Sequence, residues 1–277
     1  MPAFVSVKDP KSGKTILGAE DGVNQSYCDL LFYVDATPGS SIDDPERPSI
    51  PDEGDKEEPK PDEDENVTGT LAFEDIWPSG GDYDMNDVIV EYERKVYFDK
   101  KNIVTKIVDE FTPVHDGATY VNAFAYQIDA AQIGDKITLP EGAILEKETS
   151  SIIVMSNAKQ NIGNKYVVTR EFNGSFLKNQ LLSYNPYIIV KYSQGKRNRT
   201  EVHLPKHKAT AYANQSLIGS NDDAYYIDRK GAYPFAIDIP MLGFTPVTER
   251  NRIDSQYPGF ATWAKSMGND CKDWYKK

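Results

Sequence analysis

Hydrophobic and polar residues alternate regularly in the run that begins at Asp87. In "DVIVEYERKVYF" (87–98) apolar residues recur at every second position over most of the run. One face carries Val88, Val90, Tyr92, Val96 and Phe98, and the other carries Glu91, Glu93, Lys95 and, just beyond the run, Asp99. Successive side chains of a β-strand point to opposite faces, so this period of two predicts a strand buried on one side.

Four later segments show similar β-rich patterns, with Gly, Asn and Pro between them. They are "ATYVNAFAYQI" (118–128), "SSIIVMS" (150–156), "KYVVTREF" (165–172) and "YIIVKYS" (187–193). Short strands divided by turn residues are typical of sandwiches and jelly rolls, whereas alternating helices and strands indicate parallel sheets. The sequence therefore predicts a mainly β fold, an antiparallel β-sandwich or jelly roll.

One helix is expected near the C-terminus. The segment "YPGFATWAKSMG" (257–268) places Phe260, Trp263 and Met267 at helical spacing, and Gly268 is a suitable stop. We expect a short C-terminal helix that covers an open end of the sandwich. Its aromatic residues are interpreted as core rather than as a binding site.

The composition changes between residues 38 and 66, where Pro, Asp, Glu and Ser dominate. From Asp43 to Glu65 there are 12 acidic and 3 basic residues, a net charge of −9 out of −12 for the whole chain. Like-charge repulsion and low hydrophobicity prevent folding, and proline keeps such a segment extended. The sequence predicts a disordered acidic linker over 38–66 and a main domain over 67–277.

Residues 1–37 precede this linker and contain two strand-like runs, "FVSV" and "LLFYVD". A piece of this size buries too little apolar surface to offset the entropy lost on ordering. We expect it to be the C-terminal end of a larger β-rich domain. The alternative is that its strands join the sheet of the following domain, because exposed strand edges seek partners.

Charge and hydropathy narrow the classes of partner. There is no apolar run long enough to span a bilayer. Nucleic-acid binding needs clustered Lys and Arg, and the one basic cluster, "GKRNRT" (195–200), is typical of a solvated turn. The start, "MPAFVSVKDP", has neither the basic region nor the apolar region of a signal peptide. Cys28 and Cys271 flank the linker, and their spacing does not predict whether they pair.

The segment "GDYDMNDVIVEY" (81–92) carries the strongest chemical signal. Asp82, Asp84 and Asn86 have the D-x-D-x-N spacing of an EF-hand, and Glu93 lies at the position of its bidentate carboxylate. However, the sixth position is Asp87 instead of glycine, and a strand follows instead of a helix. An EF-hand is therefore rejected.

A cation can still be expected at this loop, because crowded carboxylates repel one another and a divalent ion relieves that repulsion. Oxygen-only ligands suit calcium, whereas zinc would favour His or Cys. The expected ligands are Asp82, Asp84, Asn86 and Asp87, with Glu74 and Asp75 completing the shell. In the alternative interpretation these residues form Asx-type turns that accept backbone N–H groups.

Other candidates carry weaker signals. Trp77 and Tyr83 could form a sugar-stacking platform, although such aromatics more often pack over a loop. His203 and His207 are four residues apart, but Pro205 breaks the helix that would align them on zinc. The acidic segment "NDD" (221–223) could contribute to a second cation site, but a surface turn is the preferred interpretation.

The loop has an internal counterpart. Residues 17–34 and 71–92 both run from an apolar residue through Glu-Asp and a loop to Asp and a strand. In the first copy, Asn24, Ser26 and Cys28 occupy the positions of Asp82, Asp84 and Asn86. If the motif binds a metal, the second copy is the competent one.

Three segments, "FEDIWPSGGDYDMNDVIVEY" (73–92), "YPFAIDIP" (233–240) and "YPGFATWAKSMGNDCKDWY" (257–275), closely resemble the LruC domain of bacterial surface proteins. The likeness covers 67–275, and residues 1–37 resemble the end of a β-rich domain of unknown function that often precedes it. The resemblance implies an exported, often lipid-anchored envelope protein of the kind common in Bacteroides-like bacteria, without an established catalytic activity.

Together these observations favour a non-catalytic, calcium-stabilised envelope module that binds a glycan or a surface protein. A structural spacer in a surface lipoprotein is the first alternative. A glycan-cleaving enzyme with paired carboxylates such as Asp75 and Asp87 is the second, and it would need those groups about 5 to 10 Å apart across a cleft.

Overall fold

The computed structural model describes residues 3–8, 15–20, 30–34, 63–174, 176–220, 225–230 and 232–276. The chain divides into two compact units, Met1–Pro61 and Asp62–Lys277. The first unit contains an antiparallel three-stranded sheet in the order β1–β2–β3. Its strands are β1 (Ala3–Lys8), β2 (Thr15–Glu20) and β3 (Leu30–Val34). The sequence predicted the outer two of these strands and missed β2, because Gly18 weakens the strand signal.

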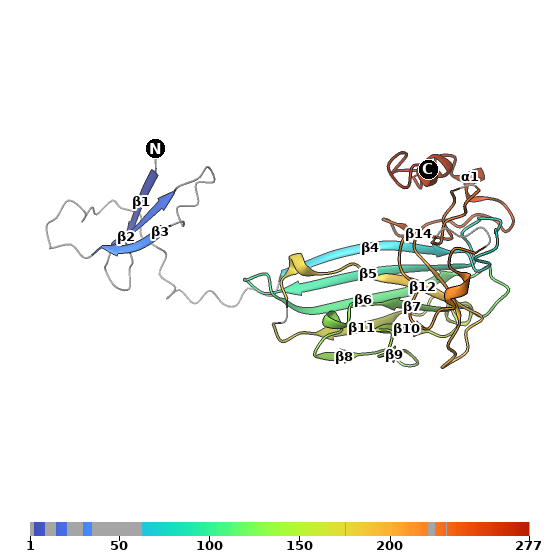
Figure 1. The fold of residues 1–277 in the computed structure, drawn as a ribbon, viewed down its shortest axis with the longest axis horizontal. Coiled ribbons are helices and arrows are strands. Elements are labelled where there is room, and N and C mark those ends of the chain that lie inside the picture. Colours follow the sequence, from blue (N-terminus) through green and yellow to red (C-terminus); the bar gives the residue numbers. More distant parts are fainter. Residues whose placement is uncertain are drawn as a thin grey trace. The chain divides into compact units, whose positions relative to one another are not determined.

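The second unit is a β-sandwich of two antiparallel sheets (Figure 1). One sheet has the order β14 (Ala236–Ile239), β4 (Glu63–Phe73), β5 (Val88–Phe98), β6 (Val104–His115), β11 (Tyr166–Glu171) and β8 (Lys136–Thr138). The other has the order β13 (Thr200–His203), β12 (Asn185–Val190), β7 (Ala123–Gln127), β10 (Ser151–Met155) and β9 (Ile144–Glu146). The predicted mainly β sandwich is confirmed.

The core lies between these sheets and is rich in aromatic residues. Phe111 of β6 and Phe124 of β7 meet across the gap, with ring centroids 5.1 Å apart. The five segments predicted as strands form β5, β7, β10, β11 and β12. The structure adds β4 and β6, which pair with β5 on either side. β4 begins at Glu63, so the last four residues of the predicted linker belong to a strand.

Short helices complete the second unit. They are the 3-10 turns η1 (Ala130–Gln132), η2 (Lys159–Asn161), η3 (Lys178–Gln180) and η4 (Gln215–Leu217), and the α-helices α1 (Ile253–Gln256) and α2 (Phe260–Lys265). Figure 1 shows the C-terminal segment at the end of the sandwich where β4 ends. None of the helices in the described ranges is long and apolar enough to cross a membrane.

The C-terminal helix region follows the sequence pattern in part. Phe260 is fully buried, and the N–H of Gly268 caps the segment by donating to Trp263 O at 2.8 Å, with Gly268 at φ +86°. Trp263, also expected in the core, is only partly buried, and Met267, at the same helical spacing, is 55% exposed because α2 ends at Lys265. Cys271 is exposed and unpaired, while Cys28 lies outside the described residues.

A buried ion pair links β6 and β11 within the six-stranded sheet. Arg170 is fully buried and Asp109 almost so, with Nη2 and Oδ2 3.3 Å apart. Arg94 Nε lies 3.1 Å from the other oxygen of Asp109, and Arg170 Nη1 donates to Gln132 O at 2.6 Å. Burial raises the pKa of Asp109, while both arginines oppose that effect. Removing one partner would leave a charge without compensation in the core.

We expect Arg170→Met to lower the free energy of unfolding by about 3 to 5 kcal/mol, because Asp109 would lose its main buried partner. Urea denaturation followed by circular dichroism measures this change. The control is Lys136→Met, which removes the solvent-exposed pair between Lys136 and Glu171 and should cost less than about 1 kcal/mol. Equal losses in the two variants would contradict the structural role of the buried pair.

Candidate metal centre

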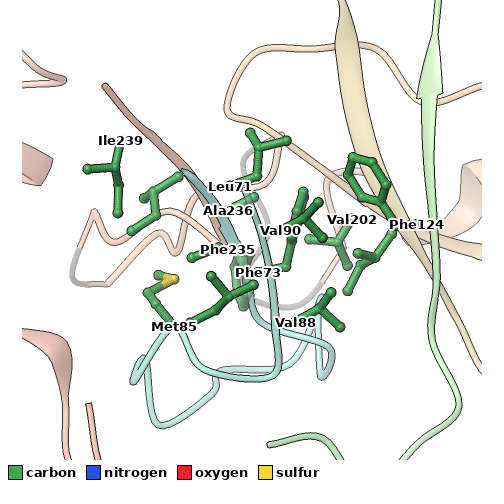
Figure 2. Packing of buried hydrophobic residues seen from close by; sticks show 14 of the residues in the cluster. Leu71, Phe73, Met85, Val88, Val90, Phe124, Val202, Phe235, Ala236 and Ile239 are labelled. Carbon is green, nitrogen blue, oxygen red and sulfur yellow. The ribbon is translucent and has the colours of Figure 1, made fainter. Parts of the chain in front are cut away.

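The candidate site lies in the loop that joins β4 to β5. Phe73 pairs with Val88 at the mouth of this loop, and Glu74 N donates to Phe235 O at 2.9 Å. Met85 anchors the other side, since it is fully buried among Leu71, Phe73 and Phe235 in Figure 2. The acidic segment is thus fixed to the core at both ends.

The backbone of the loop takes an uncommon path. Tyr83 and Met85 have φ values of +55° and +53°, in the left-handed region that residues other than glycine adopt at a cost of about 1 to 2 kcal/mol each. Both side chains belong to the core cluster. The residues between and beside them, Asp82, Asp84 and Asn86, carry the polar groups. Burial of two large side chains offsets the backbone strain and leaves the acids gathered in one place.

Glu74 is the central residue of this loop. Its side chain is fully buried, and Oε1 accepts a hydrogen bond from Met85 N at 2.6 Å. Oε2 is buried without a hydrogen-bond partner. Burial, followed by the charges of Asp87, Asp84 and Asp82, raises the pKa of Glu74 well above its ordinary value. A carboxylate oxygen in this position requires a proton or a cation.

Asp84 is nearly as deeply buried, at 1% exposure. Its Oδ1 accepts from Asn86 N at 3.3 Å, and its Oδ2 accepts from Arg250 N at 3.0 Å. Burial is the main cause that raises the pKa of Asp84 to about 6, and the charges of Asp82 and Glu249 add to it. Asp84 therefore belongs to the acidic cluster and also binds the backbone of the C-terminal segment at Arg250.

Glu74, Asp82 and Asp84 converge. One carboxylate oxygen from each lies within 4.8 Å of the other two, and Asp82 is the most exposed of the three residues. Two oxygens bound to the same calcium ion at about 2.4 Å can be at most about 4.8 Å apart. The spacing of the three oxygens therefore fits a shared calcium ion with only small adjustments.

Asp75 and Asp87 form a neighbouring pair. Asp87 Oδ2 accepts from Asp75 N at 2.8 Å, and Asp75 Oδ2 accepts from Asn122 Nδ2 at 2.7 Å. Burial raises the pKa of both residues, that of Asp87 to about 7, and the charge of Asp75 adds to the effect on Asp87. These carboxyl groups meet within one loop and already have donors, as the Asx-turn interpretation expects.

Asn86 acts as a connector. Its Nδ2 donates to Val247 O at 3.0 Å, and its backbone oxygen accepts from Gly117 N at 3.0 Å. A Cβ atom on Gly117 would lie 2.6 Å from Asn86 Oδ1, so glycine permits this close approach. Of the six expected ligands, the structure brings three together, pairs two others beside them, and places Asn86 between loops.

Sequence reasoning missed the residues that shape the cluster. Arg250 contributes only its backbone N–H from 166 positions away, and Asn122 lies 47 positions from its partner. A Cβ atom on Gly81 would lie 2.5 Å from Glu74 Oε2, so Gly81 leaves room for that oxygen. Only Gly81 could have been noticed locally, as part of the Gly-Gly step before Asp82.

The remaining candidates have structural roles or lie outside the description. Trp77 and Tyr83 are 4% and 7% exposed and pack against Tyr226 and Tyr233, so the sugar-platform alternative is wrong. His203 is fully buried, hydrogen-bonds Asn185 and Glu201 and stacks on Tyr187, which leaves no access for zinc.

Glu93 lies far along β5, where it accepts from Asn66 and pairs with Lys95, in agreement with the rejection of an EF-hand. The "NDD" turn (221–223) is outside the described residues, and so are residues 21–29, which hold most of the loop in the internal counterpart. The loop at 74–87 therefore remains the candidate metal site among the described residues.

Comparison with known proteins gives a family and a fold. The family model described as "Domain of unknown function (DUF4842)" matches residues 102–275. A crystal structure of a candidate lipoprotein from Bacteroides ovatus has a TM-score of 0.60 at 16% sequence identity, and the alignment covers 100% of this chain and 91% of that chain. No curated protein matches the chain. The candidate loop precedes the matched family region.

We expect Gly81→Ala to destabilise the second unit by about 1 to 3 kcal/mol, because the new methyl group would collide with Glu74 Oε2. Thermal or urea unfolding measures the loss. Gly80→Ala, at the exposed neighbouring glycine, is the matched control and should leave stability within about 0.5 kcal/mol. A neutral Gly81→Ala variant would show that Glu74 Oε2 does not occupy this position.

We also expect the metal-free protein to lose stability as the pH rises. The pKa values of Asp84 and Asp87 are raised to about 6 and about 7, so the folded state binds protons more tightly than the unfolded state. This contribution is complete below about pH 4, the unfolded value, and is lost as the pH rises through 6 and 7. Melting curves in chelator at pH 5 and pH 8 measure the effect, and a higher melting temperature at pH 8 would contradict it.

Proposed function

Since the chain belongs to the family described as "Domain of unknown function (DUF4842)", we propose a function from its site: the β-sandwich is a non-catalytic module that binds one calcium ion at Glu74, Asp82 and Asp84. One observation carries this proposal. Glu74 Oε2 is buried and has no hydrogen-bond partner, while two further carboxylate oxygens lie within 4.8 Å of the ligand oxygen of Glu74. Burying a charged oxygen is costly unless a cation compensates it.

The chemistry of the cluster favours calcium over other metals. Its members offer only oxygen atoms, whereas zinc sites use His and Cys. Calcium accepts about 6 to 8 oxygens in flexible geometry, so three carboxylates can bind in mono- or bidentate fashion and water can fill the remaining positions. Magnesium demands a stricter octahedron at about 2.0 to 2.1 Å and dehydrates reluctantly, so it is less suited to a site built from several protein carboxylates.

The proposed role of the ion is to hold the loop closed. With calcium bound, the repulsion among Glu74, Asp82 and Asp84 becomes attraction to a shared ion. Asp84 also accepts the N–H of Arg250, so the ion would stabilise the C-terminal segment as well. Asp75 and Asp87 lie side by side in this loop instead of facing each other across a cleft, which favours a binding module over a glycan-cleaving enzyme.

The cellular setting in the proposal is the cell envelope. The fold shared with a candidate lipoprotein and the motifs that resemble the LruC domain both favour an exported module that displays a glycan- or protein-binding surface. Extracellular calcium modules bind with Kd values of about 10⁻⁴ to 10⁻³ M, which matches calcium concentrations outside cells. A spacer between envelope domains is the alternative, and a glycan array separates the two, because a spacer retains no sugar.

The full chain should melt about 3 to 6 °C higher at a calcium concentration ten times the Kd than in chelator. Binding at that concentration contributes about 1.4 kcal/mol, and 1 kcal/mol shifts the melting temperature of a domain of this size by about 2 to 4 °C. Differential scanning calorimetry and isothermal titration calorimetry measure the shift and the affinity.

Two variants test which groups bind the ion. Glu74→Gln and Asp84→Ala should both abolish the calcium response. Glu74→Gln should keep the metal-free protein at least as stable, because it removes a buried charge without changing shape. Glu148→Gln, at an exposed acid outside the cluster, is the control and should respond like the unmodified chain. A melting temperature unaffected by calcium in the unmodified chain would refute the proposal.

A further inference from the structure

A cavity of about 440 Å³ opens where the end of β13, strand β14 and helix α2 approach one another. Most of its lining is apolar, including Leu204, Ile227, Pro234, Trp263 and Met267. Its volume falls within the range of about 300 to 1,000 Å³ that is typical of small-molecule sites. Neither Glu74 nor the other members of the acidic cluster line it, so it is separate from the proposed calcium site.

The cavity continues into the sandwich. A second cavity of about 320 Å³ shares Leu204, His207 and Asp238 with it and is further lined by residues of both sheets, among them Tyr92 of β5 and Tyr126 of β7. β13 and β14 are edge strands of their respective sheets. The two cavities therefore form a groove along the open edge of the sandwich.

Charge is unevenly distributed along this groove. Lys206 and Lys265 line the larger cavity, both are exposed, and neither forms an ion pair with an acid in the described ranges. Asp238 lies where the cavities join and accepts a hydrogen bond from Tyr92 Oη at 3.1 Å. In a chain with a net charge of −12, the larger cavity thus carries two positive charges that no acid of the described part of the chain pairs.

We propose that this groove binds a single aliphatic carboxylate, with the alkyl chain against Trp263 and Ile227 and the anionic head beside Lys206 and Lys265. Asp238 repels an anionic head at the junction of the cavities, and Arg94, which lines the inner cavity, is already paired with Asp109, so the head is placed beside the two lysines. This inference is independent of calcium binding, since it rests on other residues at another place.

The lining favours an alkyl chain over a sugar. Among the described residues that line the larger cavity, only Lys206, His207, Asp238 and Lys265 carry titratable side chains, and Trp263 adds one indole N–H. A sugar would bury hydroxyl groups against Leu204, Pro234 and Trp263 without partners, which is costly. An alkyl chain loses nothing there and gains by leaving water. The cavity volume of about 440 Å³ suits one small molecule and is too small to receive the surface of a membrane.

The test titrates the full chain with decanoate below its micellar concentration, in calcium and in chelator, by calorimetry and tryptophan fluorescence. We expect saturable one-to-one binding and a fluorescence change that Trp263→Phe removes, because Trp77 and Trp274 are buried at 4% and 7% exposure. Binding should be present in both buffers. Absence of saturable binding in both would overturn this proposal and leave the calcium proposal untouched.

A charge-introducing variant locates the site. Met267 lines the cavity, is 55% exposed and has φ +54°, a conformation that Asp adopts more readily, so Met267→Asp should fold normally. It places a negative charge in the lining of the cavity, close in sequence to Lys265, and should weaken decanoate about ten-fold. Ile162→Asp, at a 47% exposed apolar residue outside both cavities, is the matched control and should bind normally. Equal affinities for the two variants would overturn the location.

The lysines test the charge of the ligand. Lys206→Gln and Lys265→Gln should each weaken decanoate about two-fold to five-fold, as expected for an exposed ion pair, and should leave binding of neutral decanol unchanged. Lys101→Gln, at an exposed lysine outside both cavities, is the control. If decanol binds as tightly as decanoate to the unmodified chain, the ligand needs no anionic head and that part of the proposal is wrong.

Discussion

The buried carboxylate of Glu74 is the constraint around which the loop between β4 and β5 is organised. One of its oxygens accepts the N–H of Met85, and that bond holds Met85 in its left-handed conformation with its side chain in the core (Figure 2). The other oxygen has no donor. The same residue supports the loop and lacks compensation for its charge. A cation that binds Glu74 would therefore also stabilise the loop.

This loop also positions the C-terminal segment. Asp84 accepts from Arg250 N, Asn86 donates to Val247 O, and Tyr83 O accepts from Ile253 N, where α1 begins. Three polar contacts thus attach residues 247–253 to this loop, and the contacts of Asn86 and Asp84 span 161 and 166 positions of the sequence. Trp263 follows on α2 and forms one wall of the groove. The groove and the acidic loop are therefore built on the same segment, although they share no side chain.

Strands were predictable where one face is apolar, as in β5, and were missed where tertiary structure overrides the local pattern. β6 places Asp109 on its buried face and contains Pro113, and both residues weaken a strand signal. Asp109 is tolerated there because Arg170 and Arg94 compensate its charge. β4 begins with acids that resemble the linker, and only its pairing with β5 makes Glu63 part of a strand. In both cases partners distant in sequence supply what the segment itself lacks.

The same reasoning applies to the candidate site. The D-x-D-x-N spacing predicted a loop crowded with oxygen atoms, and the loop is crowded. The number of carboxylates in the loop can be read from the sequence, but which of them already accept hydrogen bonds cannot. Asp87 accepts the N–H of Asp75, whereas Glu74 keeps one bare oxygen because Gly81 leaves space beside it. Asn86 donates its Nδ2 to Val247 O, and its Oδ1 is also buried without a partner. A cation is attracted by unsatisfied oxygens and not by the number of acids, so the binding residues follow from the hydrogen bonds of the folded loop.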